Sequence, residues 1–223
     1  AASRLITSET ARTRPSPRSY ARGMLAGRSG LSPVMVGRAA HLHQLQNALH
    51  RGGVALVTGD AGIGKSRLVR ELLAANGTPG GGTARKLAAE ENRLVLAGQA
   101  EVGGLSHPFA LFVDAVGDHI DPPDPRLQRL QASDEVTLPL GDRHRLAREL
   151  LDEVAGSHPV LLVFEDLHWA DSESITLFES LAGDRHRQVS LLGTYRPTGL
   201  SRRHPLAEVL PRVERRVDVI HIR

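Results

Sequence analysis

Eight consecutive residues restrict the possible folds of this chain more than any other feature of its sequence. They match the pattern G-x-x-x-x-G-K-[S/T] and read Gly59, Asp60, Ala61, Gly62, Ile63, Gly64, Lys65 and Ser66. An apolar run, 54–57, precedes them, and leucines at helical spacing follow between positions 68 and 73. Glycines let backbone N–H groups converge on an anion, and the first turn of a helix adds the positive end of its dipole. The sequence therefore predicts a strand, a phosphate-binding loop and a helix in succession.

The last two residues of this run indicate the chemistry of the loop. Lys65 is expected to reach the β- and γ-phosphates of a nucleotide, and the Ser66 hydroxyl is expected to bind Mg²⁺. A glycine-rich turn with a chance Lys-Ser pair is the alternative, but Lys65 and Lys86 are the only lysines in the chain, so a chance match is rare. No guanine-specific Asn-Lys-x-Asp run is present. The phosphate loop binds phosphates and not the base, so it does not separate ATP from GTP; the missing guanine motif favours ATP, with Mg²⁺ as the expected cation.

The rest of the chain alternates between strand and helix patterns. Apolar runs at 94–97, 160–164, 189–192 and 217–220 are separated by stretches with apolar residues at helical spacing, and 121–141 is expected to be an irregular connection. Such alternation favours parallel strand pairing with helices on both faces of the sheet. The predicted fold class is α/β, with a five-stranded parallel sheet.

Two adjacent acids, Glu165 and Asp166, follow the most apolar strand. Ligands of open α/β sheets bind at the carboxyl ends of strands, where one acid can hold Mg²⁺ and its neighbour can orient or deprotonate a water molecule. The alternative is ordinary helix capping, a role that suits Asp166 or Asp171. His168 and Trp169 are expected to be structural, with Trp169 packed against the sheet or a helix.

Arg196 follows the run 189–192 after three further residues. Because parallel strands end at the same edge of a sheet, we expect Arg196 to lie near the phosphate loop and contact the γ-phosphate. A surface arginine before Pro197 is the alternative. The predicted catalytic residues are Glu165, Asp166 and Arg196, and the predicted metal ligands are Ser66, Glu165 and Asp166.

Charge is distributed unevenly along the chain. Residues 1–33 contain six arginines and a single acid, a net charge of +5, so the remainder carries −2 of the total of +3. This stretch lacks lasting periodicity and is expected to be a disordered basic tail before an ordered domain at 34–223. The net-acidic body argues against direct DNA binding. No membrane-length apolar run, secretory signal or cysteine is present, so a cytoplasmic protein is expected.

The motifs together resemble those of one protein family. Val36-Gly37-Arg38 precedes a leucine-patterned helix, and the runs Thr58–Leu68, Glu165–Asp171 and Leu192–Arg196 follow in order. They are similar to the AAA-type, origin-recognition-like ATPase domain of STAND NTPases, as found in large ATP-binding LuxR-type transcriptional regulators. The resemblance covers residues 34 to about 222.

This resemblance implies a sheet in the order 5-1-4-3-2 and a role for each motif. The nucleotide would be held by Arg38, near its base, and by the run from Gly59 to Arg67. Arg196 would be the γ-phosphate sensor on the fourth strand. Glu165 stands where many relatives have the magnesium-linked Asp, and Asp166 stands where the hydrolytic acid is expected.

The resemblance also bears on what lies outside this domain. The chain ends at Arg223, directly after the fifth expected strand. The lid domain of the relatives is therefore expected to be absent, with further domains or partner proteins supplying lid and effector functions. The implied function is a nucleotide-dependent switch that responds to ATP and ADP, with slow ATP hydrolysis, in a transcriptional regulator.

Two alternatives stay open. An initiator-type, DNA-associated AAA ATPase would need a basic face or a winged helix. A small-molecule P-loop kinase would need arginines over the phosphates, for which Arg143, Arg145 and Arg148 on a predicted helix are candidates. A solvated helix face explains these three arginines better.

Overall fold

In the computed structural model, five strands form one all-parallel sheet. The structure describes residues 37–50, 52–74, 93–102, 107–120, 124–132, 139–184, 188–198 and 200–222, so the expected basic tail lies outside the described residues. The strands are β1 (Val54–Thr58), β2 (Leu94–Gln99), β3 (Val160–Glu165), β4 (Val189–Tyr195) and β5 (Asp218–His221). They pair in the order β2-β3-β4-β1-β5, which confirms the predicted order as read from the opposite edge.

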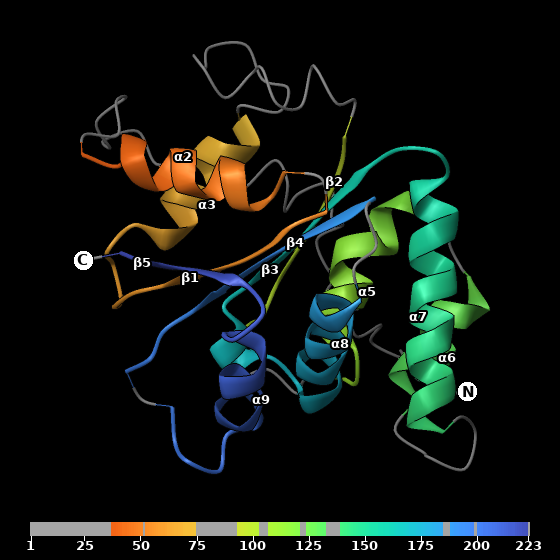
Figure 1. Cartoon of the computed structure of the whole chain (residues 1–223). Helices are drawn as coiled ribbons and strands as arrows, with labels where there is room; N and C mark the ends of the chain where they lie inside the picture. The colour runs from red at the N-terminus through yellow and green to blue at the C-terminus, as the bar shows by residue number, and fades with distance from the viewer. Residues whose placement is uncertain are drawn as a thin grey trace, which may run out of the picture. The chain divides into compact units, whose positions relative to one another are not determined.

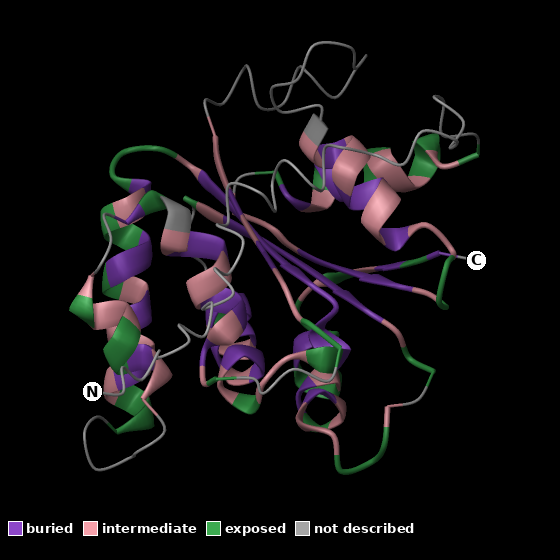
Figure 2. Ribbon diagram, turned by 180° about the vertical axis from the view of Figure 1, so that it is seen from behind, coloured by how far each residue is buried: buried purple, intermediate pink, exposed green. Residues whose placement is uncertain are grey.

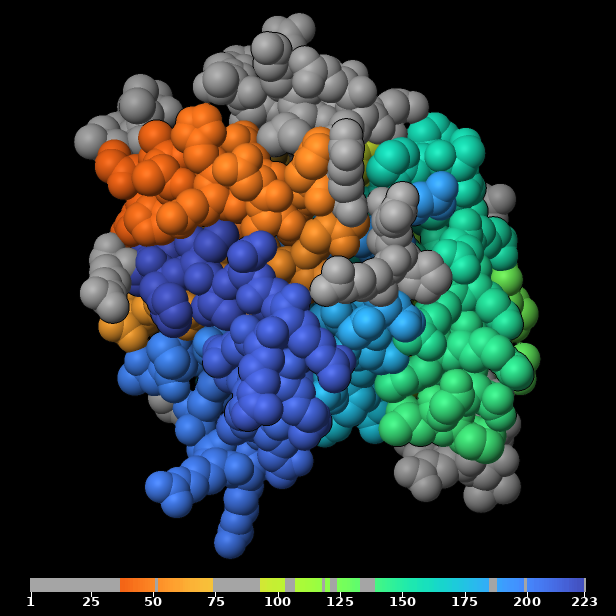
Figure 3. Space-filling view, in the orientation of Figure 1, coloured from red at the N-terminus to blue at the C-terminus, as the bar shows by residue number. Residues whose placement is uncertain are grey.

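Helices cover both faces of this sheet. They are α2 (Ala39–Ala48), α3 (Lys65–Ala74), α5 (Ala110–Val116), α6 (Pro125–Gln131), α7 (Leu140–Ala155), α8 (Ser172–Gly183) and α9 (Pro205–Val213). Figure 1 shows α2 and α3 on one face and α5 to α9 on the other. In Figure 3 the region of α9 and the edge strand β5 reaches the surface in dark blue, and α7 lies at the right of the molecule in green. Among the described helices, none is long and apolar enough to cross a membrane.

Alternate side chains of the strands build two apolar layers. In β1, Leu56 belongs to the layer beneath α5 to α9, whereas Ala55 and Val57 belong to the layer beneath α2 and α3. All residues of β3 are buried, as expected for an inner strand that helices cover on both faces (Figure 2). Burial of this apolar surface is the main force that holds the helices against the sheet.

Glycine at position 98 lets α5 pack closely on β2. A Cβ atom at Gly98 would lie 2.2 Å from the carbonyl oxygen of Leu111 and 3.2 Å from the backbone nitrogen of Ala115. Both atoms belong to the backbone of α5, so they cannot be displaced by a simple rotation of a side chain. The spacing between this strand and its helix therefore depends on the absence of a side chain.

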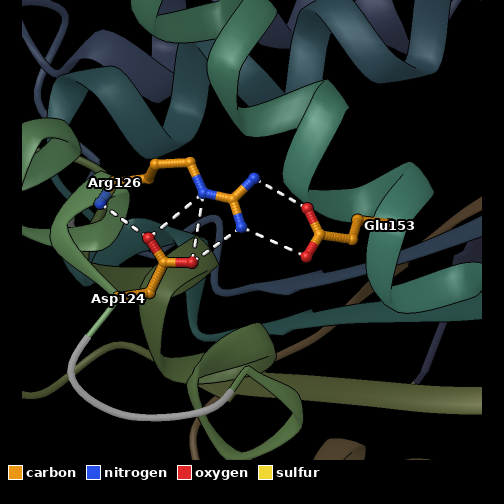
Figure 4. A network of polar contacts seen from close by, with 3 residues as sticks. All are labelled: Asp124, Arg126 and Glu153. Atoms are coloured by element: carbon orange, nitrogen blue, oxygen red, sulfur yellow. Dashed lines mark hydrogen bonds and ion pairs between the residues drawn. The ribbon is translucent and has the colours of Figure 1, made fainter.

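The prediction of an irregular connection over 121–141 is wrong for α6. Asp124 is the N-cap of this helix, and its carboxylate accepts from the backbone N–H of Arg126 at 2.8 Å. Pro125 occupies the first helical position, where its missing N–H is no loss. The Arg126 guanidinium also donates to the carboxylates of Asp124 and Glu153, which ties α6 to α7 (Figure 4). The helix therefore has a start signal in Asp-Pro.

The register of the strands aligns their carboxyl ends. Thr58 of β1 pairs with Tyr195 of β4, and Gln99 of β2 pairs with Glu165 of β3. Residues that follow these positions lie along one edge of the sheet. The loops from β1, β3 and β4 leave from this edge, and they carry the predicted site residues.

Candidate nucleotide-binding site

The loop from Gly59 to Gly64 connects β1 to α3 in a conformation that needs glycine. Gly62 and Gly64 have φ values of 74° and 102°, which residues with a side chain rarely adopt. A Cβ atom at Gly59 would lie 2.7 Å from the carbonyl oxygen of Ile222, so the loop also packs closely against the chain that follows β5. Backbone N–H groups of the loop and of the first turn of α3 are thus available to an anion.

Two arginines that are predicted to bind the nucleotide flank this loop. Arg38, directly before α2, donates from Nη2 to the carbonyl oxygen of Ile63 at 3.3 Å. Arg67 is partly buried in the first turn of α3. Contact of Arg38 with a nucleotide base stays a prediction, but its position against the loop backbone gives it a role in holding the loop.

Lys65 is folded back over the loop. Its Nζ donates to the carbonyl oxygens of Gly59 and Asp60 at 2.7 and 2.8 Å, and the residue is 6% exposed. Burial lowers the pKa of Lys65, and the charge of Arg196 lowers it further, whereas the charges of Asp166 and Asp60 raise it. A bound phosphate would favour the charged amine, because an opposite charge stabilises the protonated form.

Glu165, the last residue of β3, carries a buried carboxylate. The residue is 1% exposed, and both carboxylate oxygens lack a hydrogen-bond partner among the described residues. Burial raises the pKa of Glu165 to about 7, and the negative charge of Asp166 adds to this shift. The nearby Ser66 hydroxyl and the positive charge of Arg70 act against it. The Ser66 hydroxyl lies close without meeting hydrogen-bond geometry.

The pairing of Ser66 with Glu165 fits a divalent cation. Unpaired oxygens of a buried carboxylate and a neighbouring hydroxyl are ligands that Mg²⁺ accepts, and the cation would compensate the cost of burying the charge. Within the described ranges, no group of three or more His, Asp or Glu residues could hold a metal ion alone. Phosphate oxygens and water would therefore complete the coordination, as is usual for Mg²⁺ bound with a nucleotide.

Asp166 is held by two hydrogen bonds and has an unusual backbone conformation. Its backbone is left-handed, with φ 58° and ψ 44°, a conformation that Asp tolerates better than most residues. Its N–H donates to the Thr194 hydroxyl at 2.9 Å, and its Oδ2 accepts from Gln99 Nε2 at 3.1 Å. Bonds from β2 and β4 thus hold an acid that follows β3, the strand between them.

The two residues expected to be structural, His168 and Trp169, differ in burial. His168 is 8% exposed, its Nδ1 lies 3.9 Å from Asp166 Oδ1, and neither ring nitrogen has a hydrogen-bond partner among the described residues. Burial lowers the pKa of His168 to about 4, so the ring is neutral near pH 7. Trp169 is 41% exposed and its ring centroid lies 5.2 Å from that of His168, so its packing against the sheet or a partner helix stays a prediction.

Arg196 lies at the same edge as the acids and Lys65. Its charge acts on the pKa values of both Lys65 and His168, and its Nε is buried without a hydrogen-bond partner in the described part of the chain. Two residues later, the Thr198 hydroxyl donates to Asp60 Oδ1 of the phosphate loop at 2.6 Å. The segment after β4 is therefore bonded to the loop after β1.

Asp171 caps two helices at once. Its carboxylate accepts from the N–H and hydroxyl of Ser174 in α8, which confirms the predicted N-cap. It also accepts from the N–H groups of Phe109 and Ala110 at the start of α5, at 2.9 and 3.1 Å. Phe109 has a left-handed backbone with φ 57°. The acidic segment after β3 is thereby joined to the chain that follows β2.

Two residues of the site are missed by the sequence reasoning. Gln99 contacts Asp166 only because β2 and β3 are neighbours, and Thr194 does so only because β4 lies on the other side of β3. The available signal is their position: each is a polar residue at or near the carboxyl end of a strand. The strand order is needed to turn that signal into a contact.

Solved structures with a similar fold include origin-recognition proteins. The Aeropyrum pernix ORC1 protein in complex with DNA is 17% identical with a TM-score of 0.57, and the likeness covers 91% of this chain and 49% of that chain. A chain of Drosophila ORC bound to DNA is 13% identical, with a TM-score of 0.43 and 82% and 86% coverage. A chain of Drosophila ORC bound to AT-rich DNA and Cdc6 is 10% identical, with a TM-score of 0.48 and 92% and 56% coverage. This chain spans about half the length of the ORC1 chain, and the likeness concerns the fold alone.

The sequence shows the family more directly. No curated protein matches the chain. Residues 34–193 match the family model of the AAA ATPase domain, a span that includes the phosphate loop and both acids and ends before Arg196. The fold, the phosphate loop and this match agree, and the chain belongs to the AAA ATPase domain family.

Proposed function

We propose that this chain is a cytoplasmic domain that binds ATP with Mg²⁺, hydrolyses ATP slowly and acts as a nucleotide-dependent switch in a larger regulator of transcription, of the STAND and LuxR type. The observation that carries the proposal is the convergence of Lys65, Glu165, Asp166 and Arg196. They come from three separate segments beside a glycine-rich loop: the charges of Arg196 and Asp166 act on Lys65, and the charge of Asp166 acts on Glu165.

Each residue has a role in this proposal. The loop amides and Lys65 hold the phosphates, and Ser66 with Glu165 holds Mg²⁺, which neutralises developing charge during phosphoryl transfer. Asp166 orients the attacking water and accepts its proton. Arg196 binds the γ-phosphate, so it reports whether ATP or ADP is present.

The switch is supported by contacts that leave the site through the segment after β4. Thr198 is bonded to Asp60, and the Tyr195 hydroxyl donates to Glu214, just after α9, at 2.8 Å. A shift of Arg196 toward a γ-phosphate would change the position of the segment that carries Thr198. This segment leads to α9, which a neighbouring domain or partner protein would contact.

The test is calorimetry with ATP, ADP and GTP, each with Mg²⁺, on the wild type and on Lys65→Ala. Arg145→Ala is the matched control, because Arg145 is exposed on α7 and pairs with Asp142 and Glu149. We expect ATP and ADP to bind to the wild type and the control, GTP to bind weakly, and Lys65→Ala to lose at least about 100-fold in affinity. Equal affinities of Lys65→Ala and the wild type would defeat the proposal.

Mg²⁺ dependence gives a second readout. ATP binding to the wild type should weaken when EDTA replaces Mg²⁺, and Glu165→Gln should show most of this weakening even with Mg²⁺ present. A Glu165→Gln variant that keeps the full Mg²⁺ dependence would remove Glu165 from the proposed ligands.

An initiator-type, DNA-associated ATPase is the alternative, because the A. pernix ORC1 structure contains DNA. Fluorescence anisotropy with duplex DNA at two salt concentrations distinguishes a DNA-associated ATPase from the proposed nucleotide-dependent switch. Tight binding with a strong salt dependence would favour the alternative.

The kinase alternative has less support, since Arg148 is engaged with Ser180 and Asp184 and Arg145 with neighbours on its own helix.

A further inference from the structure

His168 is a buried polar side chain that the proposed mechanism leaves without a role. It is 8% exposed, and neither Nδ1 nor Nε2 has a hydrogen-bond partner in the described part of the chain. Leaving two polar nitrogens unpaired in a protein interior costs free energy, so packing alone would be served better by an apolar side chain. The ring also lies beside the site, with Nδ1 3.9 Å from Asp166 Oδ1.

The charged neighbours of His168 narrow its possible partners. The charges of Asp166, Arg196, Lys65 and His204 all act on it. Lys65 already donates to two loop carbonyls, and His204 Nδ1 accepts from the backbone N–H of Leu206 at 3.1 Å.

Asp166 and Arg196, the two neighbours among the predicted catalytic residues, each offer a suitable atom. Asp166 has Oδ2 bonded to Gln99, while Oδ1 faces the ring. Arg196 has a buried Nε without a partner among the described residues. A neutral imidazole can donate from one nitrogen and accept at the other, so it can join an acceptor to a donor.

We propose that His168 is a positioning residue that joins Arg196 to Asp166. Nδ1–H donates to Asp166 Oδ1, and Nε2 accepts from the Nε–H of Arg196 when the guanidinium binds the γ-phosphate. The state of Arg196 thereby sets the orientation of the acid that acts on water. This inference rests on the proposed function, since it assigns the coupling between γ-phosphate sensing and hydrolysis within the same site.

The test uses three substitutions of His168. The amide of H168N lies near the former Nδ1, the amide of H168Q lies near the former Nε2, and H168F removes both polar atoms. Affinities for ATPγS and ADP are measured by calorimetry, and ATP hydrolysis is measured separately. H158N, H158Q and H158F are the matched controls, because His158 is exposed in the turn between α7 and β3.

We expect H168F to reduce both hydrolysis and the ratio of ATPγS to ADP affinity by at least about fivefold, with ADP affinity unchanged. H168N should recover part of the hydrolysis, because the contact with Asp166 is retained, and the ratio should stay low. If H168F does not fold, H168Q replaces it and should show the same loss of hydrolysis. Hydrolysis and affinity ratios within twofold of the wild type in both H168N and H168Q would overturn the inference.

Nitrogen NMR gives a readout that needs no turnover. With ¹⁵N-labelled histidine, the signals absent from H168N identify His168, and adding ATPγS with Mg²⁺ should produce a protonated Nδ1 and a hydrogen-bonded Nε2. Unchanged His168 signals would overturn the inference. Lys65→Ala separates the two proposals. If Lys65→Ala binds nucleotide as the wild type does, the proposed function is defeated. If Lys65→Ala loses binding but the His168 variants hydrolyse ATP and bind nucleotides as the wild type does, this inference alone is defeated.

Discussion

At the scale of single residues, Glu165 links stability to pH. Its pKa is raised from 4.5 to about 7, mainly by burial, so the folded chain binds this proton more tightly than the unfolded chain does. The free energy of unfolding therefore falls as the pH rises through this range, and the loss persists at higher pH. A carboxylate placed to bind Mg²⁺ thus makes the metal-free protein less stable.

We predict that Glu165→Gln raises the free energy of unfolding at pH 8, without Mg²⁺, by about 3 kcal/mol, since one pKa unit corresponds to about 1.4 kcal/mol. At pH 4 the gain should vanish, because Glu165 is then protonated in both states. Urea unfolding at the two pH values measures the difference. The exposed Glu101→Gln variant is the control, and a Glu165→Gln variant no more stable than the wild type at pH 8 would refute the prediction.

His168 acts in the opposite direction. Burial lowers its pKa from 6.5 to about 4, so the unfolded chain binds the proton more tightly and stability is lost as the pH falls between these values. The two contributions partly cancel in the wild type. We predict that Glu165→Gln loses more stability than the wild type on acidification from pH 6.5 to 4. The double variant Glu165→Gln with His168→Asn should lose less stability over this range than Glu165→Gln alone. Parallel urea-unfolding curves for both variants over this range would contradict this assignment.

At the scale of secondary structure, Asp171 connects two helices that are distant in sequence. We predict that Asp171→Ala lowers the free energy of unfolding by about 3 kcal/mol, because it removes the N-cap of α8 and takes away the acceptor of the Phe109 N–H directly before α5, whereas Ala110 N–H keeps the carbonyl oxygen of His107. Urea unfolding measures the loss, and hydrogen exchange should accelerate at Phe109, Ala110 and Ser174. Asp152→Ala, on the exposed side of α7, is the control; equal stabilities of the two variants would contradict the double-cap role.

The close packing of α5 on β2 gives a second prediction at this scale. Gly98→Ala should cost about 1–3 kcal/mol, because a new Cβ atom meets helix backbone that has to shift. Gly141→Ala is the matched control: nothing lies within 4 Å of the new atom, so it should be neutral or stabilising. Thermal unfolding of both variants checks the pair, and similar melting temperatures would show that α5 yields without cost.

The strands and most helices could be predicted from the sequence, for a physical reason. Five apolar runs mark five strands because every strand of this sheet is covered by helices or paired beside covered neighbours. Helix α6 escapes prediction because it is short and lies in a stretch with several prolines. Its boundary depends on Asp124 as N-cap and Pro125 at the first helical position, a local signal that periodicity does not contain.

In the candidate site, too, the sequence predicts some residues and misses others. Lys65, Ser66 and Glu165 stand in linear motifs whose spacing is fixed by one loop and one strand end. The bonds from Gln99 and Thr194 to Asp166 depend on strand order and register, and the second cap of Asp171 depends on how α5 meets α8. Such contacts join residues that are distant in sequence, so no local pattern predicts them.

At the scale of the whole molecule, nucleotide binding should stabilise the folded state by mass action. At a concentration of ATP with Mg²⁺ 100 times Kd, we predict a gain of about 2.7 kcal/mol, which raises Tm by about 5–10 °C for a domain of this size. Lys65→Ala should show no such rise, whereas Arg145→Ala should match the wild type. Scanning fluorimetry measures the shifts; an equal rise in Lys65→Ala would place the nucleotide elsewhere.

The left-handed backbone at Asp166 restricts which residues can replace Asp166 during evolution. Asn and Gly adopt this conformation readily, whereas β-branched and bulky residues resist it. Asn is reached from Asp by a single nucleotide change, and it would preserve both the backbone and the bond from its N–H to Thr194. Under the proposed mechanism, descendants that bind ATP without hydrolysing it are one inherited step away, and that step leaves the fold intact.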